Sequence, residues 1–472
     1  MKRYEALAAD IEASILDGTL KSGDRLPSVR HTGTSRGISA TTVFKAYYLL
    51  EARGHVRAKD RSGYYVTAKG TRRLPPEADN ASTPEGTSIT LDVSDQVFRI
   101  LESSMSRSVV PLGSAFPSPM LFPMGRLGQA MSASMKSLDP WSTVDDLTPG
   151  HGPLRRQIAR RYLAGGMPVA LDEIVVTNGA LEALNLCLAA VTRPGDSVIV
   201  ESPTFYAALQ ALERLGLKAM EVQTHPRDGV DINALAQAIK RQKPAACWLM
   251  TNFQNPLGSS MPEAGKRALV ELLTHAGIPL IEDDVYAELY FGDRRPLPAK
   301  AFDTQGIVMH CSSFSKSLAP GYRVGWVAAG SWAREIAQLK LTTSLGAPLP
   351  TQLAVARYLE TGAFDKHLRK LRQTLQVQLA NFAHGVGHYF PAGTHATRPL
   401  GGYFLWLELP AQVSALEVHR EALQRGINVA PGPIFSASEG FTNCLRLNYG
   451  HPWTPTIENA LETLGKIVDA RC

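Results

Sequence analysis

The stretch "SSFSKSLAPGYRVGW" at residues 312–326 places a single lysine, Lys316, among small hydroxyl residues, with Arg323 seven positions further on. It follows an apolar run, "GIVMH", that is typical of a buried strand. Ligands collect at strand ends in parallel α/β sheets. Serine hydroxyls and a guanidinium are phosphate-binding groups, and a primary amine beside them suits a Schiff base. The stretch therefore predicts a site for a phosphorylated aldehyde in an α/β domain.

Pyridoxal phosphate is such a compound, and it makes three further demands on the chain. Its ring nitrogen needs a carboxylate at a strand end, and "PLIEDDVYAELYF" offers Asp283 after an apolar run. Its phenolic oxygen needs donors, for which Tyr286 and the Asn255 of "TNFQNPLG" are suitable. Its phosphate needs free backbone N–H groups at a helix start, which "VVTNGALEALNL" supplies at Gly179 and Ala180. The sequence meets all three demands.

The chain beyond residue 91 alternates short apolar runs with amphipathic helical stretches. The runs include "EIVVT", "DSVIVES", "AACWLMT", "GIPLIEDD" and "GIVMHCSSF". Nearly continuous apolar strands separated by helices indicate a parallel sheet that is covered on both faces. The last part mixes helices with strands, which predicts a smaller α+β lobe at about residues 350–472. We therefore assign residues 91–472 to an α/β body with a smaller lobe.

Residues 1–70 differ in charge from the rest of the chain. They contain twelve Lys and Arg against seven Asp and Glu, whereas the remaining residues are nearly neutral. A small basic unit joined to a large balanced one indicates that the first part meets a polyanion. Residues 71–90, rich in Pro, Glu, Ser and Thr and poor in apolar residues, are interpreted as a linker.

The pattern within this basic unit predicts three helices and a hairpin. The first helix ends at Gly18, and a second can begin at the Pro27-Ser28 step. A turn at Gly37 and an N-cap at Ser39 then introduce a third helix, and "HVRAKDRSGYYV" predicts two strands around a polar turn. This order is a winged helix-turn-helix, whose third helix enters the major groove of double-stranded DNA.

The same residues resemble the GntR-type winged helix domain over its whole length. The matching strings are "LDGTLKSGDRLPSVR", "GISATTVFKAYYLLEARGHV" and "RSGYYV". The resemblance implies a set of DNA-facing residues: Arg30, Ser39, Thr41, Thr42, Lys45, Arg61, Ser62 and Gly63. Ala40 stands where many relatives carry a base-reading arginine, so we expect Lys45 or the wing to share in base readout.

From about residue 110 onward the chain resembles the fold-type I aminotransferases. The matching segments are "TPGHGPLRRQIARRYL", "ESPTFYAAL", "NFQNPLG", "EDDVYAELYF", "SFSKSLAPGYRVGW" and "LRLNYG". The resemblance implies that Lys316 forms the aldimine with pyridoxal phosphate, and that Lys316, Asp283 and Tyr286 are the catalytic residues. It implies further roles: Asn255 and Tyr286 on the phenolic oxygen, Phe205 against the ring, Gly179, Ala180, Ser313, Ser315 and Arg323 on the phosphate, and Arg446 on a substrate carboxylate. Asp284 is an alternative to Asp283, because neighbouring strand residues point to opposite faces.

A GntR-type winged helix followed by an aminotransferase-like body resembles the MocR (GabR-like) transcriptional regulators. This resemblance implies a homodimer that binds promoter DNA and senses pyridoxal phosphate, or a small amino compound as effector, through Lys316. Two alternatives stay open. One is a working aminotransferase with an appended DNA-binding domain, and the other is a DNA-binding protein whose large domain is a cofactor-free dimerisation scaffold.

Other sequence features bear on location and metals. No run of about 18 apolar residues is present to span a membrane. The N-terminal stretch "MKRYEALAADIEASILDG" mixes charged and apolar residues, unlike a signal peptide, so we expect a cytoplasmic protein. Five scattered cysteines without a C-x-x-C pair, and histidines without ligand spacing, predict no metal site.

Overall fold

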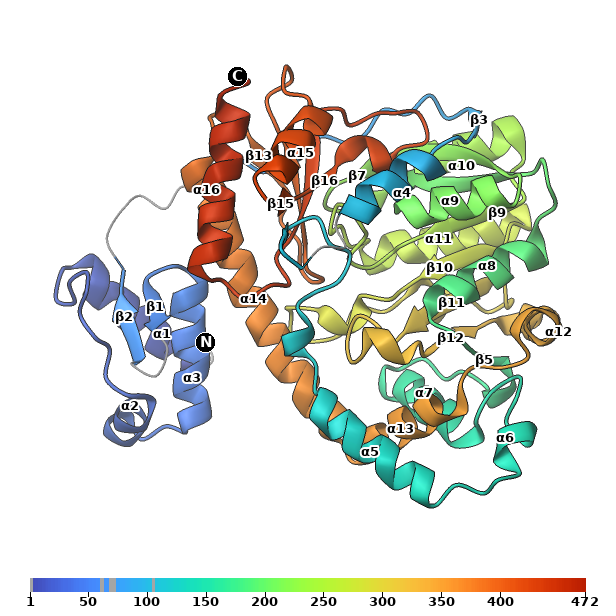
Figure 1. Ribbon diagram of the computed structural model, residues 1–472, viewed down its shortest axis with the longest axis horizontal. Coiled ribbons are helices and arrows are strands. Elements are labelled where there is room, and N and C mark those ends of the chain that lie inside the picture. Colours follow the sequence, from blue (N-terminus) through green and yellow to red (C-terminus); the bar gives the residue numbers. More distant parts are fainter. Residues whose placement is uncertain (1–2, 60–62, 68–73, 104–106) are drawn as a thin grey trace.

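The computed structural model describes residues 3–59, 63–67, 74–103 and 107–472. It contains a small N-terminal unit and a large α/β body, which meet along the long helix α14 (Ala363–Tyr389) of the body (Figure 1). None of the described helices is long and apolar enough to cross a membrane.

The N-terminal unit consists of three helices followed by a hairpin of two antiparallel strands. Its elements are α1 (Arg3–Leu16), α2 (Val29–Arg36), α3 (Ala40–Ala52), β1 (Val56–Lys59) and β2 (Gly63–Val66). Helix α3 begins after Ser39, whose hydroxyl accepts a hydrogen bond from the Thr42 amide at 3.2 Å, and Gly37 ends α2 with a φ of 62°. Four apolar residues at helical spacing on α3 are 0% exposed: Val43, Ala46, Tyr47 and Leu50. The predicted winged helix-turn-helix is confirmed.

Residues 74–90, the described part of the predicted linker, run along the large body. The Ala78 amide donates to the Ala396 carbonyl at 3.0 Å, and the Ser82 amide donates to the Thr224 carbonyl at 3.1 Å. Strand β3 (Ser88–Thr90) then pairs antiparallel with β7 at an edge of the central sheet. Residues 74–90 were interpreted as a linker that does not fold by itself, and in the structure they are held on the surface of the large body by hydrogen bonds. Backbone hydrogen bonds hold an edge strand even where few side chains are apolar.

The central sheet has nine strands, in the order β3-β7-β6-β9-β10-β11-β12-β5, with β8 beside β7. Beyond β3 the strands are β5 (Ile174–Thr177), β6 (Ser197–Ser202), β7 (Lys218–His225), β8 (Gly229–Val230), β9 (Ala246–Leu249), β10 (Leu280–Asp283), β11 (Val308–Ser313) and β12 (Gly325–Ala328). The five strands predicted from apolar runs are parallel to one another. The sheet also contains antiparallel strands that were not predicted: β12 is antiparallel to both its neighbours, and β3 and β8 are antiparallel to β7. Only residues 314–324 separate β11 from β12, and a parallel crossover needs a dozen or more.

Helices cover both faces of this sheet, as buried side chains on both sides of each strand require. In β10, Ile281 packs into a core shared with α8, whereas Leu280 packs into a second core shared with α10 and α11. Met309 and Val308 of β11 divide in the same way. The helices before the last lobe are α4 (Ser94–Ser103), α5 (Met124–Lys136), α6 (Ser142–Asp145), α7 (Gly152–Ala164), α8 (Ala180–Val191), α9 (Tyr206–Arg214), α10 (Ile232–Gln242), α11 (Glu263–Ala276), α12 (Ala333–Ser344) and α13 (Leu349–Glu360).

The remaining chain builds the smaller α+β lobe. A four-stranded antiparallel sheet has the order β13-β14-β17-β16. Its strands are β13 (His395–Ala396), β14 (Phe404–Glu408), β16 (Ala430–Pro431) and β17 (Cys444–Asn448), and its other helices are α15 (Ala415–Gln424) and α16 (Pro455–Asp469). A short parallel pair of β15 (Ile427–Asn428) with β4 (Val110–Pro111) joins this lobe to the segment that begins the large body.

Candidate functional site

Lys316 lies in the connection between β11 and β12, with its amine turned into the body. Its Nζ donates to the Ala115 carbonyl at 2.9 Å, and lies 3.8 Å from the ring centroid of Phe116 and 6.0 Å from that of Tyr286. Burial, with the positive charge of Arg446 nearby, lowers the pKa of Lys316 to about 7. A large fraction of this amine is therefore uncharged near neutral pH and able to act as a nucleophile.

Asp283 ends β10 and has a free carboxylate oxygen. It is 1% exposed, and its Oδ1 has no hydrogen-bond partner. Burial, and then the charge of Asp284, raise the pKa of Asp283 to about 7. Asp284 is equally buried, but its carboxylate accepts from His310 Nε2 at 2.9 Å, Asn252 Nδ2 at 3.0 Å and Arg295 Nη2 at 3.3 Å. Of the two acids considered for the ring nitrogen, this geometry favours Asp283, because the carboxylate of Asp284 is already engaged.

Arg446, on β17, is a fully buried cation. Its Nη1 donates to Asn255 Oδ1 at 2.9 Å, and its Nη2 donates to the Gly113 carbonyl at 2.7 Å. The rings of Phe404 and Phe435 flank its guanidinium at 4.2 and 5.1 Å. Burial lowers the pKa of Arg446, and its Nε has no hydrogen-bond partner. No carboxylate forms an ion pair with it within the described ranges, so an anionic ligand would relieve the cost of burying its charge.

Arg323 and the start of α8 form a cradle of donors. Arg323 Nη1 donates to Ser315 Oγ at 3.2 Å, and its Nη2 donates to the Asn178 carbonyl at 2.9 Å. Gly179 has a φ of 85°, and a Cβ built there would lie 2.2 Å from Arg323 Nη2. A helix N-terminus with an arginine against it is suited to an anion such as phosphate.

Three other predicted cofactor residues lie on neighbouring elements. Ser313 ends β11, and its hydroxyl accepts from the Ser315 amide at 3.3 Å. Ala180 is the first residue of α8. Phe205 directly precedes α9, and its half-buried ring lies 4.9 Å from the ring of Tyr206. These residues come from strand and helix ends that the order β6-β9-β10-β11-β12-β5 brings to one region of the sheet.

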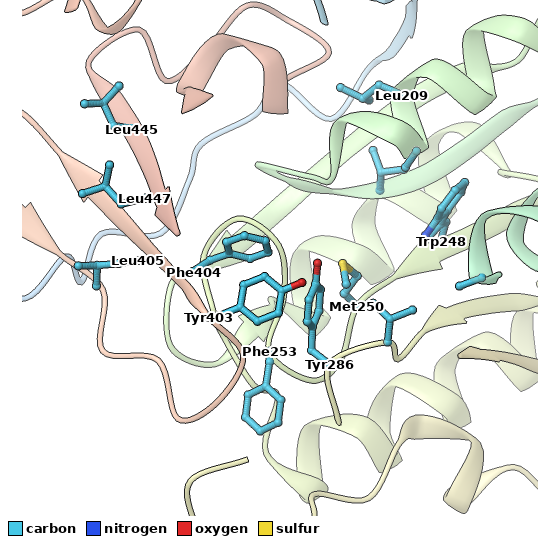
Figure 2. Close-up of a cluster of buried hydrophobic side chains, with 14 of the residues drawn as sticks. Leu209, Trp248, Met250, Phe253, Tyr286, Tyr403, Phe404, Leu405, Leu445 and Leu447 are labelled. Atoms are coloured by element: carbon cyan, nitrogen blue, oxygen red, sulfur yellow. The ribbon is translucent and has the colours of Figure 1, made fainter. Parts of the chain in front are cut away.

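The structure adds residues that the motifs did not indicate. The ring of Tyr403 meets that of Tyr286 edge-on at 5.4 Å (Figure 2), and its hydroxyl donates to the Ala115 carbonyl at 3.1 Å. Asn448 Nδ2 donates to the Phe116 carbonyl at 2.7 Å. The segment around Ala115 thus covers Lys316, although about 200 residues separate them in the sequence. Of these residues, Asn448 alone could have been found from the sequence, because it lies two positions after Arg446 and side chains two apart on a strand point to the same face.

The DNA-facing residues implied by the resemblance lie on the surface where the structure describes them. Exposed side chains or backbone occur at Arg30, Ser39, Thr41, Lys45 and Gly63, and Thr42 is half-buried. Arg61 and Ser62 fall outside the described residues. Arg30, Ser39, Thr41 and Gly63 lie on α2, at the start of α3 and at the hairpin, where a winged helix would meet DNA. Lys45 instead lines the crevice between α3 and α14.

The chemistry of the site fits pyridoxal phosphate. Buried polar atoms without partners occur on Asp283, Asn255 and Arg446, which were predicted for the ring nitrogen, the phenolic oxygen and a carboxylate. The cradle at Gly179 would be filled by a Cβ. In the part of the chain that the structure describes, no group of three or more His, Cys, Asp or Glu could hold a metal ion.

Comparisons with known proteins agree with both parts of the fold. The model of the bacterial regulatory proteins of the gntR family matches residues 3–66, and the aminotransferase class I and II model matches residues 147–464. The chain is 45% identical to the uncharacterized HTH-type transcriptional regulator YdcR of Escherichia coli (strain K12), with 100% of both chains covered. It is 30% identical to 2-aminoadipate transaminase of Thermus thermophilus, over 78% of this chain and 92% of that protein.

Solved structures of aminotransferases are similar to the large body of this chain. The α-aminoadipate aminotransferase LysN of Thermus thermophilus, complexed with N-(5'-phosphopyridoxyl)-L-leucine, superposes with a TM-score of 0.73 at 28% identity. The match covers 81% of this chain and 96% of LysN. The class of protein is therefore a GntR-type winged helix joined to a fold-type I aminotransferase body. The chain belongs to the aminotransferase class I and II family and has the architecture of the MocR (GabR-like) regulators.

Proposed function

We propose that this protein is a transcriptional regulator that binds promoter DNA through its winged helix and senses pyridoxal phosphate or an amino compound at Lys316. The observation that carries the proposal is the presence in one chain of a gntR unit and of a lysine with a pKa of about 7 near the buried Asp283, whose Oδ1 has no hydrogen-bond partner. Regulators such as YdcR cover the same full length. A DNA-binding regulator of this kind acts in the cytoplasm.

The side chains described above would hold the cofactor in this proposal, with Phe205 against its ring and Ser313 near its phosphate. Pyridoxal phosphate supplies an aldehyde that reacts with primary amines and a ring that withdraws electrons. Arg323 and Ser315 bind its phosphate, and the oxygen of Asp283 keeps its ring nitrogen protonated. Asn255 and Tyr286 supply donors for its phenolic oxygen. Because the pKa of Lys316 is lowered to about 7, a large fraction of this amine would be uncharged at neutral pH and able to attack the aldehyde.

Arg446 gives the site its preference for a carboxylate. Its planar guanidinium can bind a carboxylate through two parallel hydrogen bonds. The aromatic rings around it exclude water, which strengthens a charge pair. The effector is then an amino compound that carries a carboxylate, and LysN, a relative, was solved with a phosphopyridoxyl amino acid.

Exposed apolar side chains on the large body support a homodimer. Leu345, at the end of α12, is 59% exposed, and its carbonyl accepts a hydrogen bond from Thr148. Trp141 and Val144, next to and in α6, are 71% and 57% exposed. Contact with a second copy of the chain would remove such side chains from water.

Footprinting tests the proposal on the DNA upstream of the protein's own gene, with and without pyridoxal phosphate. We expect sequence-selective protection whose extent changes with the cofactor. A Lys316→Ala variant should bind DNA but lose the visible absorbance of the cofactor-loaded protein. The absence of selective protection under both conditions would remove the idea.

The retained Asp283 favours a second candidate, a working aminotransferase. A sensor that only docks its ligand does not need a protonated ring nitrogen, whereas transfer of an amino group does. Steady-state turnover of an amino acid with a keto acid separates the two. Rates no higher than those of free pyridoxal phosphate would exclude the enzyme.

A further inference from the structure

The third helix of the winged unit rests on the large body by one of its faces. Helix α3 packs against α14, and a crevice of about 590 Å³ lies between the two parts of the chain. On the winged-helix side it is lined by Lys45, Tyr48 and Leu49 of α3. On the other side, Tyr290 and Arg372 contribute to its lining. The helix predicted to read DNA therefore takes its position partly from the body.

A single short segment runs from the Lys316 site to this crevice. It begins at Asp283, passes Tyr286 beside Lys316, and reaches Tyr290 in the wall of the crevice within eight residues. The segment is firmly held at its far end, because the Phe291 amide donates to the Leu400 carbonyl at 2.9 Å. A displacement of Tyr286 would therefore strain this short segment rather than be absorbed in a loose loop.

Glu288 is the charged centre of this segment. Its Oε1 accepts from Arg161 Nη2 at 2.8 Å and lies 3.9 Å from Arg295 Nη1. Arg295 in turn donates to Asp284, the neighbour of the cofactor carboxylate Asp283, at 3.3 Å. Asp284 and Glu288 thus share the guanidinium of Arg295.

Arg372 continues the chain of contacts into α14. Its Nη1 donates to the Glu288 carbonyl at 3.1 Å, and its guanidinium lies 4.1 Å from the ring centroid of Tyr290. Arg161, the other partner of Glu288, donates through Nη1 to Asp365 of α14 at 3.1 Å. Two arginines therefore tie the Glu288 turn to the helix on which α3 rests.

We propose that Glu288 and Arg372 are positioning residues that couple ligand binding at Lys316 to the seating of α3 on α14, and thereby to DNA affinity. The coupling rests on the proposed function. A ligand shifts such an equilibrium only through a difference in its contacts with the two states. The difference is made at Asp283 and Tyr286, and the Glu288 turn carries it because Glu288 is held by half-buried arginines through directional hydrogen bonds.

The test measures a ratio in the full-length protein: the affinity for the footprinted operator fragment with saturating pyridoxal phosphate, divided by that without it. Fluorescence anisotropy gives the operator affinity, and an absorbance titration gives the cofactor affinity. In Glu288→Gln and Arg372→Gln we expect this ratio to move toward one by about 3- to 30-fold. The cofactor affinity, and the operator affinity without cofactor, should change less than about twofold.

Arg369→Gln is the matched control, because Arg369 lines the same crevice from α14 and no contact with the Glu288 turn is described for it. It should keep the wild-type ratio. An unchanged ratio in folded Glu288→Gln and Arg372→Gln would overturn the coupling, as would an equal loss in all three variants. If Glu288→Gln unfolds, Arg372→Gln decides alone.

Failure of the coupling can be told apart from failure of the proposed function. A wild-type protein that binds no DNA, or whose DNA affinity ignores pyridoxal phosphate, contradicts the proposed function and the coupling with it. A wild-type protein that responds to the cofactor, together with variants that respond equally, contradicts the coupling alone.

Discussion

Replacing Gly179 by alanine should weaken the binding of pyridoxal phosphate without unfolding the large body. The new Cβ would lie 2.2 Å from Arg323 Nη2 and 2.7 Å from its Cζ, so the guanidinium must move by about 1 Å or more to reach ordinary contact. That movement breaks the alignment of Arg323 with the Ser315 hydroxyl and with the anion it is proposed to hold. A misaligned charge-assisted hydrogen bond costs about 1.5–3 kcal/mol, which corresponds to a roughly 10- to 150-fold loss of affinity.

Absorbance titration with pyridoxal phosphate measures this loss, and Gly166→Ala is the control. Gly166 has a φ of 80°, close to the 85° of Gly179, but a Cβ there meets nothing within 4 Å. Both variants place alanine at a positive φ, which costs about 1 kcal/mol or more, and only one displaces Arg323. Equal cofactor affinities for the two variants would refute the assignment of Arg323 and Gly179 to the phosphate.

Three further predictions follow from the site and the winged helix. The rate of cofactor capture should rise with pH through about 7 and then level, because Lys316 has a pKa of about 7; an ordinary lysine would be about 200-fold less deprotonated at pH 8. In Asp283→Asn the midpoint should move to lower pH, since the charge of Asp283 raises the pKa of Lys316; stopped-flow absorbance across pH 5–10 measures both midpoints, and a wild-type midpoint near 10, or a midpoint that is unchanged in Asp283→Asn, would contradict this reasoning. Arg446→Gln should weaken binding of an amino acid about 10- to 150-fold while leaving that of the matching amine without a carboxylate unchanged, and a parallel loss for both ligands would argue against the carboxylate role. Leu50→Ala, at a residue that is 0% exposed, should destabilise the winged helix by about 2–5 kcal/mol and abolish operator binding, with cofactor binding retained; Phe44→Ala, at a 44% exposed residue of the same helix, should change the unfolding temperature little.

Local patterns in the sequence were enough to predict both parts of the fold. The third helix and its cap at Ser39 follow from residues next to one another, and so does the placement of Asp283 and Lys316 at strand ends. These features depend on backbone geometry within a few residues, which composition and spacing report directly.

Contacts over long sequence distances were not predictable in the same way. The bond from Arg446 to Asn255 joins residues 191 positions apart, and the segment at Ala115 reaches Lys316 only because the small lobe folds back. The edge strand β3 was missed because it has only three residues and is not buried. The reversed strand β12 is as long as β10 and equally buried, and nothing in its side-chain pattern reports its antiparallel direction. Their positions are set by connection length and by backbone hydrogen bonding, which side-chain patterns do not encode.

The attachment of residues 74–90 to the large body sets a limit on where the DNA-binding unit can travel. From Thr67 to Leu74 the chain has seven peptide steps, which reach about 25 Å at full extension. Thr67, the last described residue of the DNA-binding unit, can therefore lie no further than this distance from Leu74. Any new position of the unit, on an operator or on a second subunit, must meet that limit. In a homodimer, two such short connections would restrict the spacing of the two DNA half-sites that the protein can bind at the same time.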